Sequence, residues 1–156
     1  MARNHDKTDG FLLPNVNTCI VACSAAEAHL YLSRRRFGRW ILLDSMQNPG
    51  ATLREQDVYS DRPGRAFDRF GPGRHAMSPE ETGRQHGLQI FAHDIAQRLA
   101  KDFSAGRFSQ LVLVAEPSLL GLLRRKLSAP LKRSLCFEVP KNPADFDRER
   151  LRAMFT

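Results

Sequence analysis

The apolar residues of this chain change their spacing near residue 78, and that change limits the folds the chain can adopt. Before it lie three runs, residues 17–24, 26–33 and 38–45, which are β-branched and apolar or alternate between apolar and polar side chains. Such runs are typical of strands. The links between them are short and polar. We therefore expect an antiparallel three-stranded meander.

A long helix is expected directly after the meander and its following loop. Ser78, Pro79 and Glu81 form a capping box that predicts where this helix begins. The apolar residues that follow recur at helical spacing and should face the core: Leu88, Phe91, Ile95, Leu99 and Phe103.

In the rest of the chain, the residue pattern predicts alternating strands and helices. Four further elements are expected: strands at 109–116 and 135–140, and helices at 117–128 and 145–155. Because a helix precedes each strand, both strands should run parallel to their neighbours through right-handed crossovers. The predicted fold is α/β: a mixed five-stranded sheet, an antiparallel meander plus two parallel strands, flanked by helices in the ribonuclease H-like order. We expect a flexible N-terminal leader over 1–16 and a single domain over 17–156.

Composition restricts the class of protein. A chain of 156 residues with 42% hydrophobic side chains can bury one substantial core. No apolar run approaches the roughly 18 residues of a membrane span, and residues 1–10 lack the apolar stretch of a secretory signal. A cytoplasmic protein is predicted. Cys19, Cys23 and Cys136 lie in apolar runs without the paired spacing of a zinc site, so we expect buried, reduced thiols, no metal and no cofactor.

The net charge of +7 favours partners that carry phosphate or other acidic groups. Basic residues cluster in three places: Arg34, Arg35, Arg36 and Arg39; Arg62, Arg65, Arg69 and Arg74; and Arg124, Arg125, Lys126, Lys132 and Arg133. The alternative interpretation is a set of solvated turns and helix ends. Near the first cluster, Phe37 and Trp40 are expected to pack in the core, with base stacking by Phe37 or Tyr31 as the alternative. His29 is expected on the surface.

A long charged segment without apolar period contains SDRPGR (60–65) and GRHAM (73–77). Arginine side chains match the geometry of phosphate groups, and glycines let backbone amides approach an anion. The predicted anion- or nucleic-acid-binding residues are Asp61, Arg62, Gly64, Arg65, Asp68, Arg74 and His75, with Arg124, Arg125 and Lys126. The alternative is a loop stabilised by its own ion pairs, Asp61 with Arg65 and Asp68 with Arg74.

The sequence favours binding over catalysis. A two-metal nuclease needs several carboxylates that converge from the first strand and its neighbours. Residues 17–24 contain no acid, and Asp44 and Glu116 at the ends of predicted strands would make only a weak site. Ser60, Ser78 and His75 share the loop region, but no serine lies in a GxSxG elbow.

Three stretches, residues 48–77, 91–127 and the EVPKN segment at 138–142, resemble the bacterial family of host attachment proteins, described as required for attachment to host cells. The resemblance implies kinship with the middle domain of archaeal and eukaryotic class I release factors, which has a ribonuclease H-like build. That domain carries a Gly-Gly-Gln loop. Here FGPGRHA (70–76) has Arg74 and His75 where an amide would be, so peptidyl-tRNA hydrolysis by imitation of that loop is not expected.

The function expected from these features is a cytoplasmic, non-catalytic RNA- or ribosome-binding module that uses the Arg- and Gly-rich loop. Two alternatives stay open. One is a bacterial factor for attachment to the host-cell surface, acting directly or indirectly, as the resemblance implies. The other is a hydrolase centred on residues 60–76. The sequence leaves the oligomeric state open.

Overall fold

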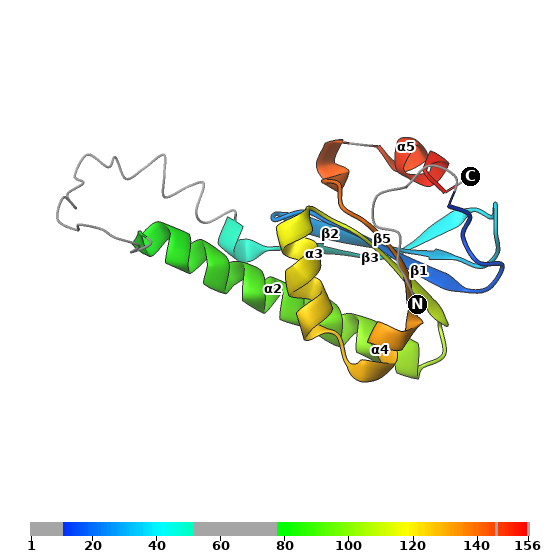
Figure 1. Ribbon diagram of the computed structural model, residues 1–156, viewed down its shortest axis with the longest axis horizontal. Coiled ribbons are helices and arrows are strands. Elements are labelled where there is room, and N and C mark those ends of the chain that lie inside the picture. Colours follow the sequence, from blue (N-terminus) through cyan, green and yellow to red (C-terminus); the bar gives the residue numbers. More distant parts are fainter. Residues whose placement is uncertain (1–10, 52–77, 146, 156) are drawn as a thin grey trace.

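The computed structural model describes residues 11–51, 78–145 and 147–155. Within them the chain forms one five-stranded sheet with helices on both faces (Figure 1). Its strands are β1 (Thr18–Cys23), β2 (Glu27–Ser33), β3 (Trp40–Gln47), β4 (Gln110–Val114) and β5 (Leu135–Val139). They lie in the order β3-β2-β1-β4-β5; β1 is antiparallel to β2 and β2 to β3, whereas β1, β4 and β5 are parallel. The predicted mixed sheet of ribonuclease H-like order is confirmed.

The described helices divide between the two faces of the sheet. They are α2 (Pro79–Ser104), α3 (Pro117–Lys126), α4 (Ala129–Ser134), the 3-10 turn η1 (Pro143–Asp145) and α5 (Arg148–Ala153), besides the helical residues 49–51. The first three lie on one face and α5 on the other (Figure 1). As predicted, the Ser78 side chain accepts a hydrogen bond from the backbone N–H of Glu81 at 3.1 Å, which satisfies a free donor of the first turn of α2. None of the described helices is long and apolar enough to cross a membrane.

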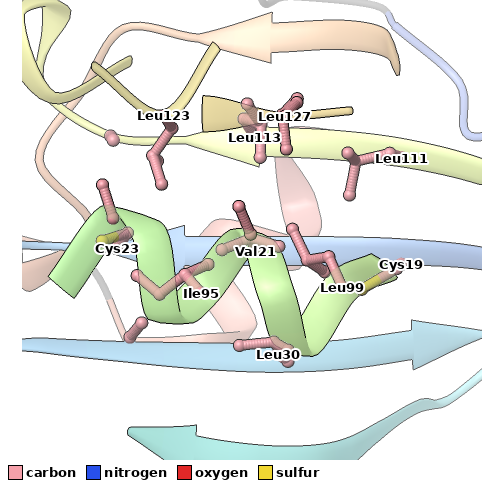
Figure 2. Close-up of a cluster of buried hydrophobic side chains, with 14 of the residues drawn as sticks. Cys19, Val21, Cys23, Leu30, Ile95, Leu99, Leu111, Leu113, Leu123 and Leu127 are labelled. Carbon is pink, nitrogen blue, oxygen red and sulfur yellow. The ribbon is translucent and has the colours of Figure 1, made fainter. Parts of the chain in front are cut away.

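The larger part of the core lies between the sheet and α2 and α3 (Figure 2). Ile95 and Leu99 of α2 and Leu123 of α3 meet strand residues such as Val21 and Leu113. All five are fully buried. The predicted apolar stripe of the long helix therefore faces the core, although Leu88 and Phe103 at its ends are only partly buried.

The second part of the core is rich in aromatic rings and lies beneath α5. Phe11 stacks on Phe137 with 3.9 Å between the ring centroids, and Phe155 packs edge-on against both rings. Leu13 is 3% exposed. Phe11 and Leu13, which the sequence assigns to a leader, thus pack against the domain. The apolar residues of that leader are too few to produce a recognisable period.

The three cysteines are free thiols. Cys19 and Cys23 are buried and Cys136 is half-buried, so the expectation of buried, reduced thiols is confirmed for the first two. Burial raises the pKa of Cys23 to about 12 and that of Cys136 to about 11, and it also raises the pKa of Cys19. A thiol that stays protonated at neutral pH is a poor nucleophile and a poor metal ligand.

Candidate nucleic-acid-binding surface

The turn between β2 and β3 carries a group of exposed basic side chains. Arg34, Arg35, Arg36 and Arg39 are all exposed. Among the described residues, the ion pairs involve other arginines and none of these four. Together with Phe37 at the turn and Arg152 of α5, we call these residues the hairpin surface.

Local hydrogen bonds hold this turn in one conformation. The backbone N–H of Gly38 donates to the carbonyl of Arg35 at 2.9 Å, and the Ser33 hydroxyl donates to the same carbonyl at 2.9 Å. Arg36 is tied to the segment before β1: its backbone N–H donates to the Asn15 side chain at 3.0 Å, and its Nε donates to the Leu13 carbonyl at 2.8 Å. The guanidinium of Arg36 is therefore oriented while its side chain stays exposed.

Phe37 does not pack in the core. Its residue is 61% exposed and has φ of +62°, whereas Trp40 is 3% exposed. The expectation of core packing is thus wrong for Phe37 and confirmed for Trp40. The reason is geometric, because Phe37 lies in the turn, beyond the last paired residues Ser33 and Trp40, where no strand alternation directs a side chain. Arg152 donates to the Phe37 carbonyl at 3.4 Å and brings α5 against the turn.

The predicted binding residues fall into two groups. Asp61, Arg62, Gly64, Arg65, Asp68, Arg74 and His75 lie outside the described residues. Three statements about this segment therefore stay predictions: that these residues bind anions, that they instead form internal ion pairs, and that a hydrolase site is centred on 60–76. Arg124, Arg125 and Lys126 lie in the last turn of α3, and all three are exposed.

Arg124 already has a partner inside the protein. Its guanidinium donates through Nε and Nη2 to both carboxylate oxygens of Glu138 on β5, the first of these bonds measuring 2.9 Å. The Glu138 side chain is 1% exposed. This bidentate hydrogen bond raises the pKa of Arg124. Of the three predicted residues on α3, Arg125 and Lys126 are thus the ones without an ion pair among the described residues.

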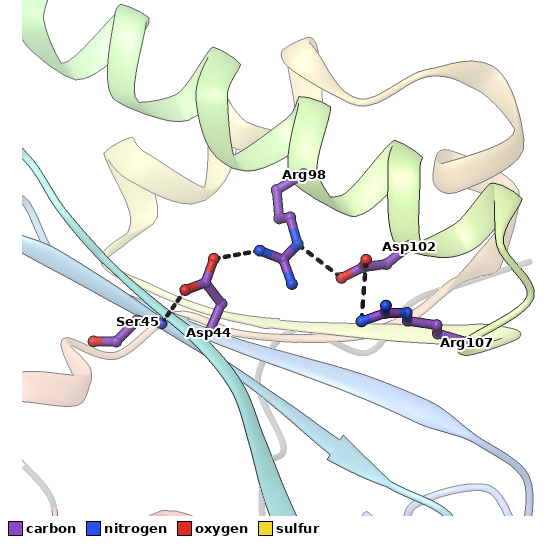
Figure 3. Close-up of polar contacts among 5 residues, drawn as sticks. All are labelled: Asp44, Ser45, Arg98, Asp102 and Arg107. Atoms are coloured by element: carbon purple, nitrogen blue, oxygen red, sulfur yellow. Dashed lines mark hydrogen bonds and ion pairs between the residues drawn. The ribbon is translucent and has the colours of Figure 1, made fainter.

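The acids considered for a metal site have other partners. Asp44 accepts from Arg98 of α2, whose Nε donates to Asp102 at 3.0 Å, and Arg107 approaches Asp102 at 3.7 Å (Figure 3). Glu116 accepts from the Asn142 amide at 3.1 Å. Across the described ranges, no three His, Cys, Asp or Glu side chains gather in a way that could hold a metal ion.

A polar hollow of about 310 Å³ at the carboxyl end of β1 was not anticipated. Its lining includes Glu27, His29, Tyr31 and Arg148. The Arg148 guanidinium lies 5.2 Å from the centre of the Tyr31 ring, within the range of a cation–π contact. His29 is half-buried here rather than fully on the surface. The alternation of 26–33 placed His29 and Tyr31 on one face, but which helix covers that face depends on the tertiary fold.

The chain matches parts of solved structures from several kinds of protein. An archaeal actin homologue matches with a TM-score of 0.49 and 10% identity, over 92% of this chain and 48% of its own. An archaeal translation termination factor matches with a TM-score of 0.46 and 11% identity, over 89% and 37%. The PilM–PilN complex of type IV pilus biogenesis matches with a TM-score of 0.45 and 17% identity, over 89% and 42%. This chain thus spans less than half of each.

No curated protein is significantly similar to the chain. The family described as "Protein required for attachment to host cells" matches residues 19–154, from the second residue of β1 to the residue after α5. The match includes every strand and helix of the described fold, and the chain therefore belongs to this host attachment family.

Proposed function

We propose that this protein binds RNA, free or within the ribosome, and that the hairpin surface contacts the phosphate backbone. In this role it is a cytoplasmic, non-catalytic module. The observation that carries the proposal is the group of exposed arginines at the β2–β3 turn that form no ion pair with other described residues. An arginine without an internal acidic partner keeps its donors available for an external anion.

Several physical features support a polyanionic partner. The net charge of +7 attracts phosphate over distances beyond direct contact, at a rate that depends on salt. The hydrogen bond from Arg36 Nε to Leu13 restricts that side chain before any ligand arrives, which lowers the entropy lost on binding. Arg125 and Lys126 supply a second exposed basic group at the end of α3. The loop residues predicted from the sequence belong to the same proposal.

A binding experiment with matched charge reversals tests this proposal. The full-length protein is titrated against a fluorescently labelled single-stranded RNA at about 50 and 200 mM salt. We expect the affinity of the wild type to fall steeply between the two concentrations. R34E/R35E should weaken binding at least tenfold, and R125E/K126E, with the same change of net charge, should weaken it less.

Two results would contradict the proposal. One is the absence of RNA binding by the wild type at the lower salt concentration. The other is an equal loss in both double variants, which would mean that net charge alone, and not the hairpin surface, determines the affinity. Circular dichroism of each variant checks that the fold is retained.

The family description favours a second candidate, direct attachment to host cells. The two candidates differ in where the protein is found. A direct attachment factor should be accessible to protease added to intact bacteria, whereas an RNA- or ribosome-binding protein should be protected and should sediment with ribosomes at low salt. If the second pattern is found, the effect on attachment is indirect.

A further inference from the structure

Phe37 exposes its aromatic ring to solvent at the turn, and its backbone has an unfavourable conformation. Its φ of +62° is in the left-handed region, which is unfavourable for a residue with a side chain. Such conformations persist where surrounding contacts impose them, and they cluster at functional sites. Here the Gly38-to-Arg35 hydrogen bond closes the turn, and Arg152 contacts the Phe37 carbonyl.

The turn also leaves little freedom for relaxation. A Cβ on Gly38 would lie 3.0 Å from both Cγ and the carbonyl oxygen of Arg35. Gly38 is therefore packed closely against Arg35, three residues earlier in the turn. The backbone on both sides of Phe37 is thus held by contacts, and the residue is 61% exposed.

A shallow hollow of about 280 Å³ lies beside the ring. It is lined by Phe37 and by Glu149, Arg152 and Ala153 of α5. Glu149 and Arg152 are three residues apart and thus lie on one side of the helix. The hollow therefore offers an aromatic face, a carboxylate acceptor and a guanidinium donor. Its volume is just below the range of about 300–1,000 Å³ typical of small-molecule sites, which suits a single planar group.

We propose that Phe37 stacks on one unpaired base of a bound RNA, with Glu149 and Arg152 at the edge of that base and the neighbouring arginines on the flanking phosphates. This inference rests on the proposed RNA-binding function and specifies its ligand as RNA with an exposed, unstacked base. Proteins read such bases by stacking aromatic or arginine side chains on them. Every base has an aromatic face, so the stacking contact itself is tolerant of sequence.

The hollow and its surroundings suit a nucleobase. Its lining is mostly apolar, which fits the flat face of a base, and Glu149 and Arg152 add one acidic and one basic group beside the Phe37 ring. Each nucleobase carries hydrogen-bond donors and acceptors on its edge and can use both groups. The four surrounding arginines would repel a basic protein partner and attract a phosphate backbone.

The test compares single-stranded RNA with an RNA duplex of the same length. Loss of one stacked base costs about 1–3 kcal/mol, which corresponds to about 5- to 150-fold in affinity. We expect F37N to weaken binding to the single strand by a factor in this range and to leave duplex binding nearly unchanged. F37W should retain the affinity for the single strand. Asn tolerates the left-handed conformation, so F37N removes the ring without adding backbone strain.

The possible results distinguish the stacking inference from the proposed RNA-binding function. Unchanged affinity of F37N for the single strand, as expected if the ring docks on a protein, overturns the stacking inference. An equal loss for single strand and duplex overturns it as well. Failure of the wild type to bind either RNA overturns the proposed function instead. R34E/R35E serves as the reference, because loss of phosphate contacts should weaken binding to both RNAs.

Discussion

At the residue scale, two neighbouring arginines of α3 differ in what they contact. Arg124 makes a bidentate hydrogen bond with Glu138, whose side chain is 1% exposed. Arg125 is exposed and forms no ion pair among the described residues. A cluster of basic residues in a sequence is therefore not a uniform surface. Some of its members neutralise buried acids, and others are available to a ligand.

This difference predicts unequal effects on stability. R124A removes the charge partner of the buried Glu138 carboxylate, and we expect the free energy of unfolding to fall by about 1–3 kcal/mol. R125A should change it by less than about 0.5 kcal/mol. Urea denaturation of both variants measures the contrast. Equal effects would show that the Arg124–Glu138 pair does not stabilise the fold.

At the element scale, two glycines belong to α2 and the turn that ends it. Gly87 lies within the helix, and Gly106 follows it with φ of +79°. At both positions a Cβ would meet no atom within 4 Å. The two sites offer the same space and differ in backbone conformation. Glycine is favoured at position 106, where the chain leaves α2, because the φ of +79° lies in the left-handed region; its backbone N–H donates to the Phe103 carbonyl at 3.0 Å.

Alanine substitutions should therefore have opposite effects at these two sites. G87A is expected to raise the free energy of unfolding by about 0.5–1 kcal/mol, because alanine loses less backbone entropy in a helix than glycine. G106A should lower it by about 1–2 kcal/mol, because alanine is strained in the left-handed region. Thermal unfolding reports both changes. A shift of the same sign in both variants would contradict this account of the helix end.

At the scale of the whole molecule, the proposed binding residues lie both inside and outside the described part of the chain. The hairpin surface has defined contacts, whereas Arg62 and Arg65 belong to a prediction from sequence alone. If the hairpin surface and the loop residues both contribute to RNA binding, charge reversal in either of them should weaken the association with RNA. The relative size of the two losses then says which part dominates.

R62E/R65E tests the contribution of the loop. We expect it to abolish co-sedimentation with ribosomes or RNA at low salt, because reversed charges repel phosphate. The matched control is R84E/K101E, which makes the same change of net charge at two exposed positions of α2. Unchanged co-sedimentation of R62E/R65E removes the loop from the proposal. An equal loss of co-sedimentation in the control would mean that net charge alone causes the effect.

Much of the fold could be predicted because its signals are local. The Ser78 cap, the apolar stripe of α2 and the alternation of β2 each depend on residues a few positions apart. The position of Phe37 could not be predicted in this way. An aromatic residue beside Trp40 has the composition of a core residue, and only the turn geometry directs it outward.

The amino-acid sequence by itself determined the strands, the three main helices, their order and the family to which the chain belongs, since periodicity, caps and motifs are properties of neighbouring residues; it did not predict α4 as a separate helix. Only the tertiary structure decided which charged groups remain available. Glu138 is distant from Arg124 in sequence but lies beside it once β5 joins β4. Likewise, α5 reaches the β2–β3 turn only through folding. Contacts between distant segments depend on how elements pack, and no local pattern records them.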